Sequence, residues 1–464
     1  MNLLYRVKGQ QHLIRVDGES GRRKKEYGVV KDWKKGTACT DETLEGIRTE
    51  CRAPALRKSR WMFAVVLIIA TNQLLVRQAA SQETQAASTP PAQTSAQATS
   101  ADQNASSPSP LPTPSITGPL QAAPPTTFEA GPLGKLSVNG VLSGMVMVQG
   151  NHVAGDDSVH PAISNGQLFI QKTTGWWQFY VQPGAYNVLI LGTPYLSTQK
   201  AVTDLFGPVP VAYLKFVPTK TTSIMVGSLP TVMGAEYTFD FQNMNIERGL
   251  LWNQENDVNR GIQVNQTFGK FTASLSWNDG FWSNRYSWLS GSLTYANGPH
   301  SVAFSAMGNL GQTKFQSLAT PVQNNSSMYA LIYTYTKGKW IVQSYVQYTD
   351  VPTNAKIGIV KGASTWGGAL LASRTFSHGF SLAGRGEYIT STGSAAEQSL
   401  NLLYGPGSAA WSVTVTPTFQ HKRFFTRGEF SFVRANSYTP GSVFGPAGTN
   451  RNQPRGVIQA GLLF

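Results

Sequence analysis

Two histidines and two aspartates lie close together in the stretch NHVAGDDSVH, as His152, Asp156, Asp157 and His160. Imidazole and carboxylate groups at this spacing could bind a metal ion or form a general acid–base pair. A solvated polar loop explains the same residues with fewer assumptions, and we favour it. The chain also lacks the G-x-S-x-G, H-E-x-x-H and P-loop motifs. The sequence therefore predicts a protein that is not an enzyme, without catalytic residues, a metal site or a cofactor.

A second set of ionisable residues lies in RGEY and RGEF, two stretches toward the C-terminus. Arg385 and Glu387 share one face of an expected strand, and Arg427 and Glu429 share one face of another, because side chains alternate along a strand. Aromatic residues such as Phe430 occupy the opposite face. Guanidinium and carboxylate groups in such rows can create an electric field or pair into a brace. Which of these they do depends on the elements that position them.

The composition favours β structure. Charged residues make up only 13% of the chain and hydrophobic residues 41%, whereas soluble helical proteins are rich in charge. Residues 1–81 hold 16 of the 38 basic and 8 of the 24 acidic residues, which leaves 22 basic and 16 acidic residues for the remainder. That modest excess does not predict nucleic-acid binding. Cys39 and Cys51 both lie in the early part, so no cysteine-based site is expected beyond it.

The N-terminal part of the chain reads as processing and linker sequence. Basic residues, the short apolar run 62–70 and small residues follow one another as in a secretory signal peptide, predicted at 56–81. A membrane anchor is the alternative, but the apolar run is too short for the ~20 residues that a spanning helix needs. We interpret 1–55 as a mis-called N-terminal extension without order, or else as a real basic extension. Residues 82–130 are rich in Pro, Ser, Ala and Thr and are predicted to be a disordered linker, either a passive tether or a contact with the cell wall.

From residue 131 to residue 464 the pattern changes to a period of two, which is typical of strands. In KFTASLSWN (270–278) one face carries Phe, Ala, Leu and Trp and the other carries Thr, Ser, Ser and Asn. An apolar face beside an uncharged polar face suits a transmembrane antiparallel β-barrel, with lipid outside and a polar lumen inside. Such a sheet must close, because no backbone group can stay unpaired in lipid.

We expect about sixteen strands, within a range of about fourteen to eighteen, because 397–405 could add one. Short turns such as FGK, NGP and KGK alternate with longer connections, as in outer-membrane barrels. The expected strands are 135–149, 163–172, 175–183, 210–218, 221–228, 258–268, 270–278, 286–296, 299–309, 327–336, 339–350, 366–376, 380–391, 410–420, 423–436 and 454–464.

A barrel of this size is wide enough to hold a water-filled channel. The fold therefore predicts passive diffusion of small hydrophilic solutes, and the alternative is a structural or surface-binding barrel with a plugged lumen. Strand alternation places four aromatic side chains on the polar face that should point into the lumen: Trp176, Tyr180, Trp288 and Tyr345. These rings could form a stacking track for sugars or fill the lumen, and we favour the second interpretation.

The segment 221–296 carries Gly227 at a strand end, MGAEYTFDFQNMNIERG and WNDGFW, and RGEY and RGEF follow later. With these features the chain resembles the putative β-barrel porin 2 (OmpL-like) family of bacterial outer-membrane proteins. The resemblance implies a porin that is exported through the periplasm of a Gram-negative cell. Outer-membrane lipid, the barrel-assembly machinery and small hydrophilic solutes are the implied partners, together with a possible second copy of the chain.

The long connection 229–257 is expected to be the third extracellular loop. By analogy with general porins it would fold into the lumen and narrow it. Acidic loop residues opposite basic wall residues would then set ion preference; the alternative, which we favour, is an Arg–Glu ladder that braces neighbouring strands. The candidate pore residues are Lys215, Glu236, Asp240, Glu247, Arg248, Arg385, Glu387, Arg427 and Glu429.

The chain ends on GVIQAGLLF, with Ile458, Ala460, Leu462 and Phe464 on one strand face. We interpret this stretch as the last strand, which pairs with the first strand and closes the barrel. It resembles the C-terminal signal read by the bacterial barrel-assembly machinery. The alternative is a frayed apolar tail.

Overall fold

The computed structural model describes residues 119–122, 124–313 and 320–464. The predicted N-terminal extension and signal peptide, and most of the predicted linker, lie outside the described residues. Among the described residues, no helix has both the length and the apolar composition needed to cross a bilayer.

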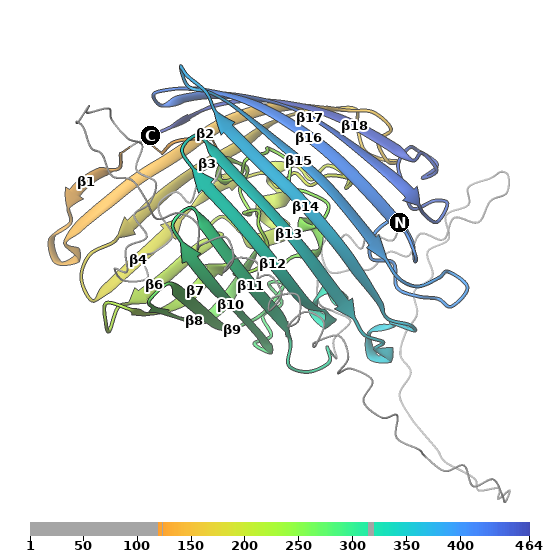
Figure 1. The fold of residues 1–464 in the computed structure, drawn as a ribbon, viewed down its shortest axis with the longest axis horizontal. Coiled ribbons are helices and arrows are strands. Elements are labelled where there is room, and N and C mark those ends of the chain that lie inside the picture. Colours follow the sequence, from red (N-terminus) through yellow and green to blue (C-terminus); the bar gives the residue numbers. More distant parts are fainter. Residues whose placement is uncertain (1–118, 123, 314–319) are drawn as a thin grey trace, which may run out of the picture. The chain divides into compact units, whose positions relative to one another are not determined.

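One antiparallel sheet closes on itself (Figure 1). Each strand pairs with its neighbour in sequence, β9 pairs with β10, and the last strand, β18, pairs with β2. β4 and β5 both pair with β3 and are separated only by Pro183, so they form one interrupted barrel strand. The barrel therefore has sixteen strands, and β1 adds a short pairing to the start of β2.

The strands are β1 (Thr126–Glu129), β2 (Lys135–Gln149), β3 (Val159–Lys172), β4 (Trp177–Gln182), β5 (Gly184–Tyr186), β6 (Val211–Phe216), β7 (Thr222–Pro230), β8 (Val258–Phe268), β9 (Phe271–Asn278), β10 (Trp288–Asn297), β11 (His300–Asn309), β12 (Ser327–Lys337), β13 (Trp340–Val351), β14 (Ala363–Thr375), β15 (Phe380–Ser391), β16 (Ala409–His421), β17 (Phe424–Ser437) and β18 (Asn452–Leu463). The short helices are η1 (Gly131–Leu133), α2 (Thr198–Ala201), η2 (Val202–Phe206), η3 (Asp240–Gln242), η4 (Trp252–Gln254), η5 (Gln323–Asn325) and η6 (Ala355–Ile357).

The predicted strands are confirmed, each within four residues at either end. The stretch 397–405 forms turns and is not an additional strand. Tight turns join the strands at one rim of the barrel, and the longer connections lie at the other rim. We call these the short-turn rim and the long-loop rim.

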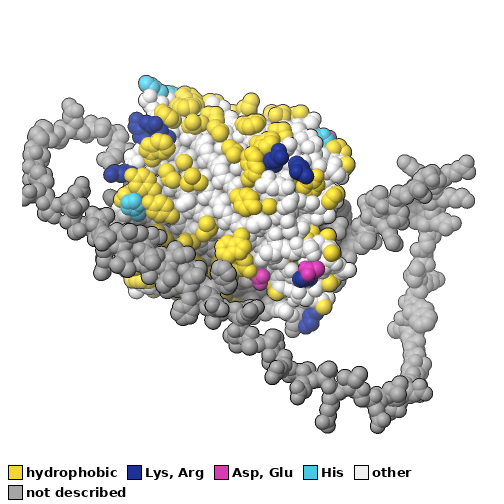
Figure 2. Space-filling model, turned by 45° about the vertical axis from the view of Figure 1, so that its right-hand side comes forward, with side chains coloured by type: hydrophobic (Ala, Val, Ile, Leu, Met, Phe, Trp, Pro, Cys, Tyr) yellow, Lys and Arg dark blue, Asp and Glu magenta, His cyan; other side chains and the backbone are white. Residues whose placement is uncertain are grey.

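β16 shows how the two faces of the wall differ. Thr414 and Thr416 are fully buried on the inner face, whereas Val413 and Val415 on the outer face are 47% and 42% exposed. Hydrophobic and uncharged side chains dominate the outer wall, and the charged side chains in view lie toward its ends (Figure 2). This outer face suits lipid, because charged groups there would cost several kcal/mol.

Aromatic rings mark both edges of the outer wall. Near the short-turn rim, Phe271 lies 5.6 Å from Phe268 and 5.0 Å from Tyr295 between ring centroids. Toward the long-loop rim, Tyr348 lies 4.8 Å from Trp366. Aromatic residues favour the two membrane interfaces, so these girdles bound the apolar band.

The C-terminal residue closes the barrel at the short-turn rim. The Phe464 amide donates to the Gly140 carbonyl at 2.9 Å, and the Gly140 amide donates to the Phe464 carbonyl at 2.6 Å. A side chain at position 140 would overlap the Phe464 ring where it now lies and would have to displace it. Ile458 and Leu462 face outward, 68% and 44% exposed. The GVIQAGLLF stretch is therefore a paired closing strand, and a frayed tail is excluded.

Candidate functional site

The connection between β7 and β8, residues 231–257, lies inside the barrel; we call it the inner loop. It forms hydrogen bonds with inward-facing side chains of β3, β11, β13, β15, β16, β17 and β18. These strands lie on different sides of the ring. A segment that contacts all of them must cross the lumen.

Carboxylates of the wall accept hydrogen bonds from the backbone of the inner loop. Glu429 on β17 accepts from the amides of Ile246 at 2.5 Å and Glu247 at 2.8 Å. Glu387 on β15 accepts from the Leu250 amide at 3.1 Å. An irregular segment has no ladder to satisfy its own backbone groups, and burying them unpaired is costly. The wall therefore supplies the acceptors that a regular element would find within itself.

Arg427 on β17 supplies the matching donors. Its guanidinium donates to the carbonyl oxygens of Asp240 at 3.1 Å, Asn243 at 3.0 Å and Met244 at 2.8 Å. Thr416 on β16 adds its hydroxyl, which accepts from the Asn245 side-chain amide at 2.7 Å. The middle of the inner loop is thus held through its backbone, from both the donor and the acceptor side.

Ion pairs reinforce these contacts. Arg385 on β15 lies 2.5 Å from Glu236 of the inner loop and 3.2 Å from Glu387 of its own strand. Arg455 on β18 lies 3.0 Å from Glu247. All five side chains are almost fully buried. Charges in such a place are stable only when they are paired, so loop and wall neutralise each other by direct contact.

The nine candidate pore residues all lie in the lumen or on the inner face of the wall, and all are buried. Seven belong to the contact between the inner loop and the wall. Arg248 donates to the carbonyls of Ile246 in its own loop and Asn187 in the β5–β6 connection, and Lys215 lies on the inner face of β6. β16 separates β15 from β17, so the charged rows do not pair into the favoured ladder between neighbouring strands. They hold the inner loop instead. A role in narrowing the pore remains a proposal.

Sequence reasoning missed several partners in this contact. Asp240 accepts from the side-chain amides of Asn165 on β3 and Gln459 on β18, both at 2.6 Å. Arg455 was also missed, although strand parity places it opposite Ile458 and hence inward. The same parity argument that selected Arg385 would have found Arg455.

Glu255 and Asp257, at the C-terminal end of the inner loop, form no ion pair with an arginine of the wall among the described residues. Glu255 is 4% exposed, and neither of its carboxylate oxygens has a hydrogen-bond partner among the described residues. Burial raises the pKa of Glu255 well above its usual range, and the charges of Glu236 and Asp257 raise it further. Gly234 (φ +82°) lies directly against this carboxylate, where any side chain would overlap it.

A cavity of about 230 Å³ lies beside the inner loop; we call it the chamber. Residues of β4 and β13 line it, and these strands stand on opposite sides of the ring, so the chamber spans the lumen. Its lining mixes uncharged polar, aromatic and aliphatic residues with two acidic ones. The residues are Tyr180, Gln182, Val211, 230–239, Gln242, Asp257, Val258 and Gln343.

Three of the four aromatic residues predicted on the polar face are buried inside the barrel: Tyr180, Trp288 and Tyr345. The prediction is wrong for Trp176, which is 69% exposed and stacks on the outward-facing Phe216 at 6.1 Å. Trp176 precedes the strand β4 in a tight turn, where strand alternation does not apply. The four predicted rings therefore do not form one track; Tyr180 instead has ring contacts with Phe169 and Tyr213.

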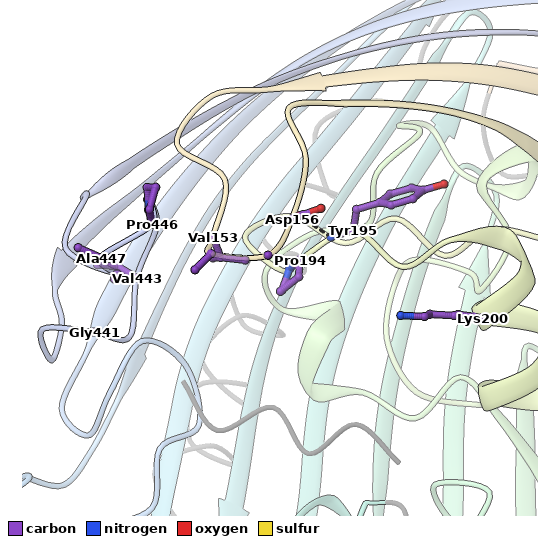
Figure 3. Close-up of a pocket in the computed structure, with 13 residues that line it drawn as sticks. Val153, Asp156, Pro194, Tyr195, Lys200, Gly441, Val443, Pro446 and Ala447 are labelled. Atoms are coloured by element: carbon purple, nitrogen blue, oxygen red, sulfur yellow. Dashed lines mark hydrogen bonds between the residues drawn. The ribbon is translucent and has the colours of Figure 1, made fainter. Parts of the chain in front are cut away.

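The histidine–aspartate cluster lies at the long-loop rim, where Asp156 and Tyr195 come together from two connections (Figure 3). The Asp156 carboxylate accepts from the Gln149 side chain at 2.9 Å and the Tyr195 amide at 3.0 Å, and lies 3.1 Å from His160. The His160 ring stacks on Tyr195 at 4.0 Å. The expected solvated loop is wrong for His160, which is 8% exposed. No group of three metal-ligating side chains occurs in the described parts of the chain.

Beside this cluster lies a second cavity, of about 430 Å³, at the long-loop rim. It is lined by 153–156, Pro194, Tyr195, Lys200 and the glycine-rich connection between β17 and β18. The Asp156 carboxylate in its wall already has four partners. The cavity is therefore a mouth between loops rather than a built binding site.

A short apolar segment occupies the opposite mouth, at the short-turn rim. Leu120 is 1% exposed and belongs to the same apolar cluster as the inward-facing Phe425 and Leu463. The inward-facing Gln420 side chain donates to the Gln121 carbonyl at 2.8 Å and accepts from the Gln121 amide at 2.7 Å. The described residues just before β1 thus lie within this mouth.

Comparisons with known proteins agree with this architecture. The family model described as putative beta-barrel porin-2, OmpL-like, matches residues 135–464. A comparison with curated proteins gave no match. Among solved structures, the anion-selective porin from Comamonas acidovorans is similar at 13% identity and a TM-score of 0.50, over 71% of this chain and 99% of that one. The outer-membrane channel DcaP of Acinetobacter baumannii is similar at 10% identity and a TM-score of 0.50, over 74% of this chain and 100% of that one. At these identities the likeness shows a common fold alone.

Proposed function

The chain belongs to the putative β-barrel porin-2, OmpL-like family and is a porin of the bacterial outer membrane; we propose that it lets small hydrophilic solutes diffuse passively. The chamber is the observation that carries this proposal, because it spans the lumen between β4 and β13 and its lining includes the uncharged polar groups of Gln182, Thr231, Thr238, Gln242 and Gln343. Elsewhere on the inner wall, Ser274 on β9 and Ser292 on β10 are small, polar and partly exposed.

Liposome swelling tests the proposal. Vesicles that contain the purified protein are expected to swell in isotonic solutions of small sugars, at rates that fall as the sugar becomes larger. Protein-free vesicles are the control. Absence of swelling at every sugar size would contradict diffusion and favour the alternative, a structural or surface-binding barrel whose lumen is plugged. The extensive burial of the inner loop is the observation that favours this alternative.

The proposal includes the surroundings of the barrel. The apolar outer face of the barrel would contact outer-membrane lipid. If copies of the chain associate, the particle mass measured in detergent would be a multiple of the mass of one chain. Ile458, Ala460, Leu462 and Phe464 would serve as the signal for the barrel-assembly machinery. Residues 56–81 would direct export to the periplasm and 82–130 would link to the barrel.

We also propose that the short-turn rim faces the periplasm and that Leu120 narrows the mouth of the barrel at this rim. Leu120→Ser is expected to raise single-channel conductance in planar bilayers, because the segment would lose its buried place in the apolar cluster that includes Phe425 and Leu463. Burying a leucine contributes about 1.5–3 kcal/mol. Phe128→Ser on β1 is the matched control, since Phe128 is 48% exposed. Equal conductance of the Leu120 variant and the unaltered protein would contradict the proposal.

A further inference from the structure

The charged groups that line the chamber are all acidic. Among the described lining residues only Glu236 and Asp257 carry a charge, and no lysine or arginine is present. Lys215 on β6 does not line the chamber either. A wall with charges of one sign raises the local concentration of oppositely charged ions.

The two carboxylates differ in how far they are neutralised. Glu236 lies 2.5 Å from the Arg385 guanidinium and also accepts from the Gly249 amide at 2.8 Å. The Oδ1 atom of Asp257 is buried and has no hydrogen-bond partner among the described residues. The Arg248 guanidinium donates instead to two carbonyl oxygens, at 3.2 and 3.3 Å. Asp257 therefore has no ion-pair partner among the described residues. Burial raises the pKa of its carboxyl and the charge of Arg248 lowers it; because the residue is only partly buried, water or a cation in the chamber can stabilise its ionised form.

Glu255 is a further acidic residue behind the lining, and it contributes negative charge only when its carboxyl ionises. Its carboxylate lies directly against Gly234, which itself lines the chamber, so only glycine backbone separates the two. Both Glu255 oxygens are buried without a partner among the described residues. An unpaired buried carboxylate is costly, and a cation in the chamber would lower that cost.

Aromatic rings form part of the same lining. Tyr180, Tyr237 and Phe239 line the chamber together with Asp257. The Tyr180 ring is held by stacking on Tyr213 at 5.5 Å. Aromatic faces and a carboxylate together recognise organic ammonium groups, because the ring quadrupole and the anion both attract a cation.

From these features we propose that the chamber selects cations over anions, and that small organic ammonium ions bind in it during passage. This inference rests on the proposed diffusion of solutes through the lumen. Asp257 is the residue that determines the sign of the selectivity, and the aromatic lining determines the retention of organic ammonium ions.

Reversal potentials of the full chain in planar bilayers test the sign. With a potassium chloride gradient, we expect the permeability of potassium to exceed that of chloride, by about threefold or more. Asp257→Asn keeps the shape of the side chain and should bring the ratio close to one. Asp204→Asn, a change of an exposed acid outside the chamber, should leave it unaltered. A preference for chloride, or an Asp257→Asn variant with an unchanged ratio, would overturn the proposal.

Block by an organic cation tests the aromatic lining. Tetramethylammonium added to one side should reduce the potassium current, and Phe239→Leu should weaken this block several-fold without changing the potassium-to-chloride ratio. Equal block in the two proteins would remove the aromatic part of the proposal. Liposome swelling with sugars distinguishes failure of the cation selectivity from failure of the porin function. Swelling without cation preference would overturn only the selectivity, whereas loss of both swelling and conductance would overturn the porin function as well.

Discussion

The double variant Arg385→Ala, Arg427→Ala is expected to release the inner loop from the wall and to raise single-channel conductance at least severalfold. Arg427 donates to three backbone carbonyls of the loop. Arg385 neutralises Glu236 and donates to the Glu247 carbonyl at 2.7 Å. Removal of one partner of a buried ion pair costs about 3–5 kcal/mol, because the other charge stays behind unpaired.

The barrel itself should survive this change. Its strands are held by continuous backbone pairing, which the two substitutions do not touch. The variant should therefore still migrate as a folded barrel in an unheated gel, and its ion selectivity should shift along with its conductance. Arg374→Ala is the control, since Arg374 lies near the short-turn rim beside Trp340 and Phe376. Conductance and selectivity equal to those of the unaltered protein would mean that the four wall charges serve only as a brace.

Deletion of Phe464 is expected to cause a large loss of folded protein in the outer membrane, larger than that of any other variant proposed for this chain. The deletion removes two backbone hydrogen bonds with Gly140 and uncovers the glycine that the ring covers. It also removes an aromatic ring from the membrane interface, where such rings are favoured. Cell fractionation with a heat-modifiability gel would measure the folded protein.

Two further variants separate the ring from the strand pairing. Phe464→Tyr keeps the ring and the backbone and should assemble normally. Gly140→Leu keeps Phe464 but displaces its ring, so it should reduce assembly in the same direction as the deletion. Normal amounts of folded barrel in the deletion variant would show that the terminal residue is not part of the assembly signal.

The direct contact between the inner loop and the wall alters which charged groups can act on a solute in the lumen. In the expected arrangement, acids of the loop faced bases of the wall across an open gap. In the structure Glu236 and Glu247 form ion pairs with arginines of the wall, and Asp240 accepts a hydrogen bond from Asn165 of the wall. The field that a solute meets would then depend on Asp257, the acid of the chamber lining that has no ion-pair partner among the described residues.

Alternation along the chain was sufficient to predict the wall. Thr414 and Val413 have opposite environments because successive side chains of a strand point to opposite faces, and lipid tolerates only one of the two. The same rule placed Arg385 and Arg427 inward without any knowledge of their partners. Trp176 marks where the rule ends, since it lies in a turn and not in a strand.

The sequence by itself thus determined the strands, their faces and the closing C-terminal strand, because each depends on neighbours a few residues apart. Only the tertiary structure decided what the lumen holds. The inner loop has no period, and its partners are remote in sequence, such as Arg455 for Glu247 and Arg385 for Glu236. Which carboxylates become neutralised, and which are left at the chamber, depends on the path of that loop through the closed barrel.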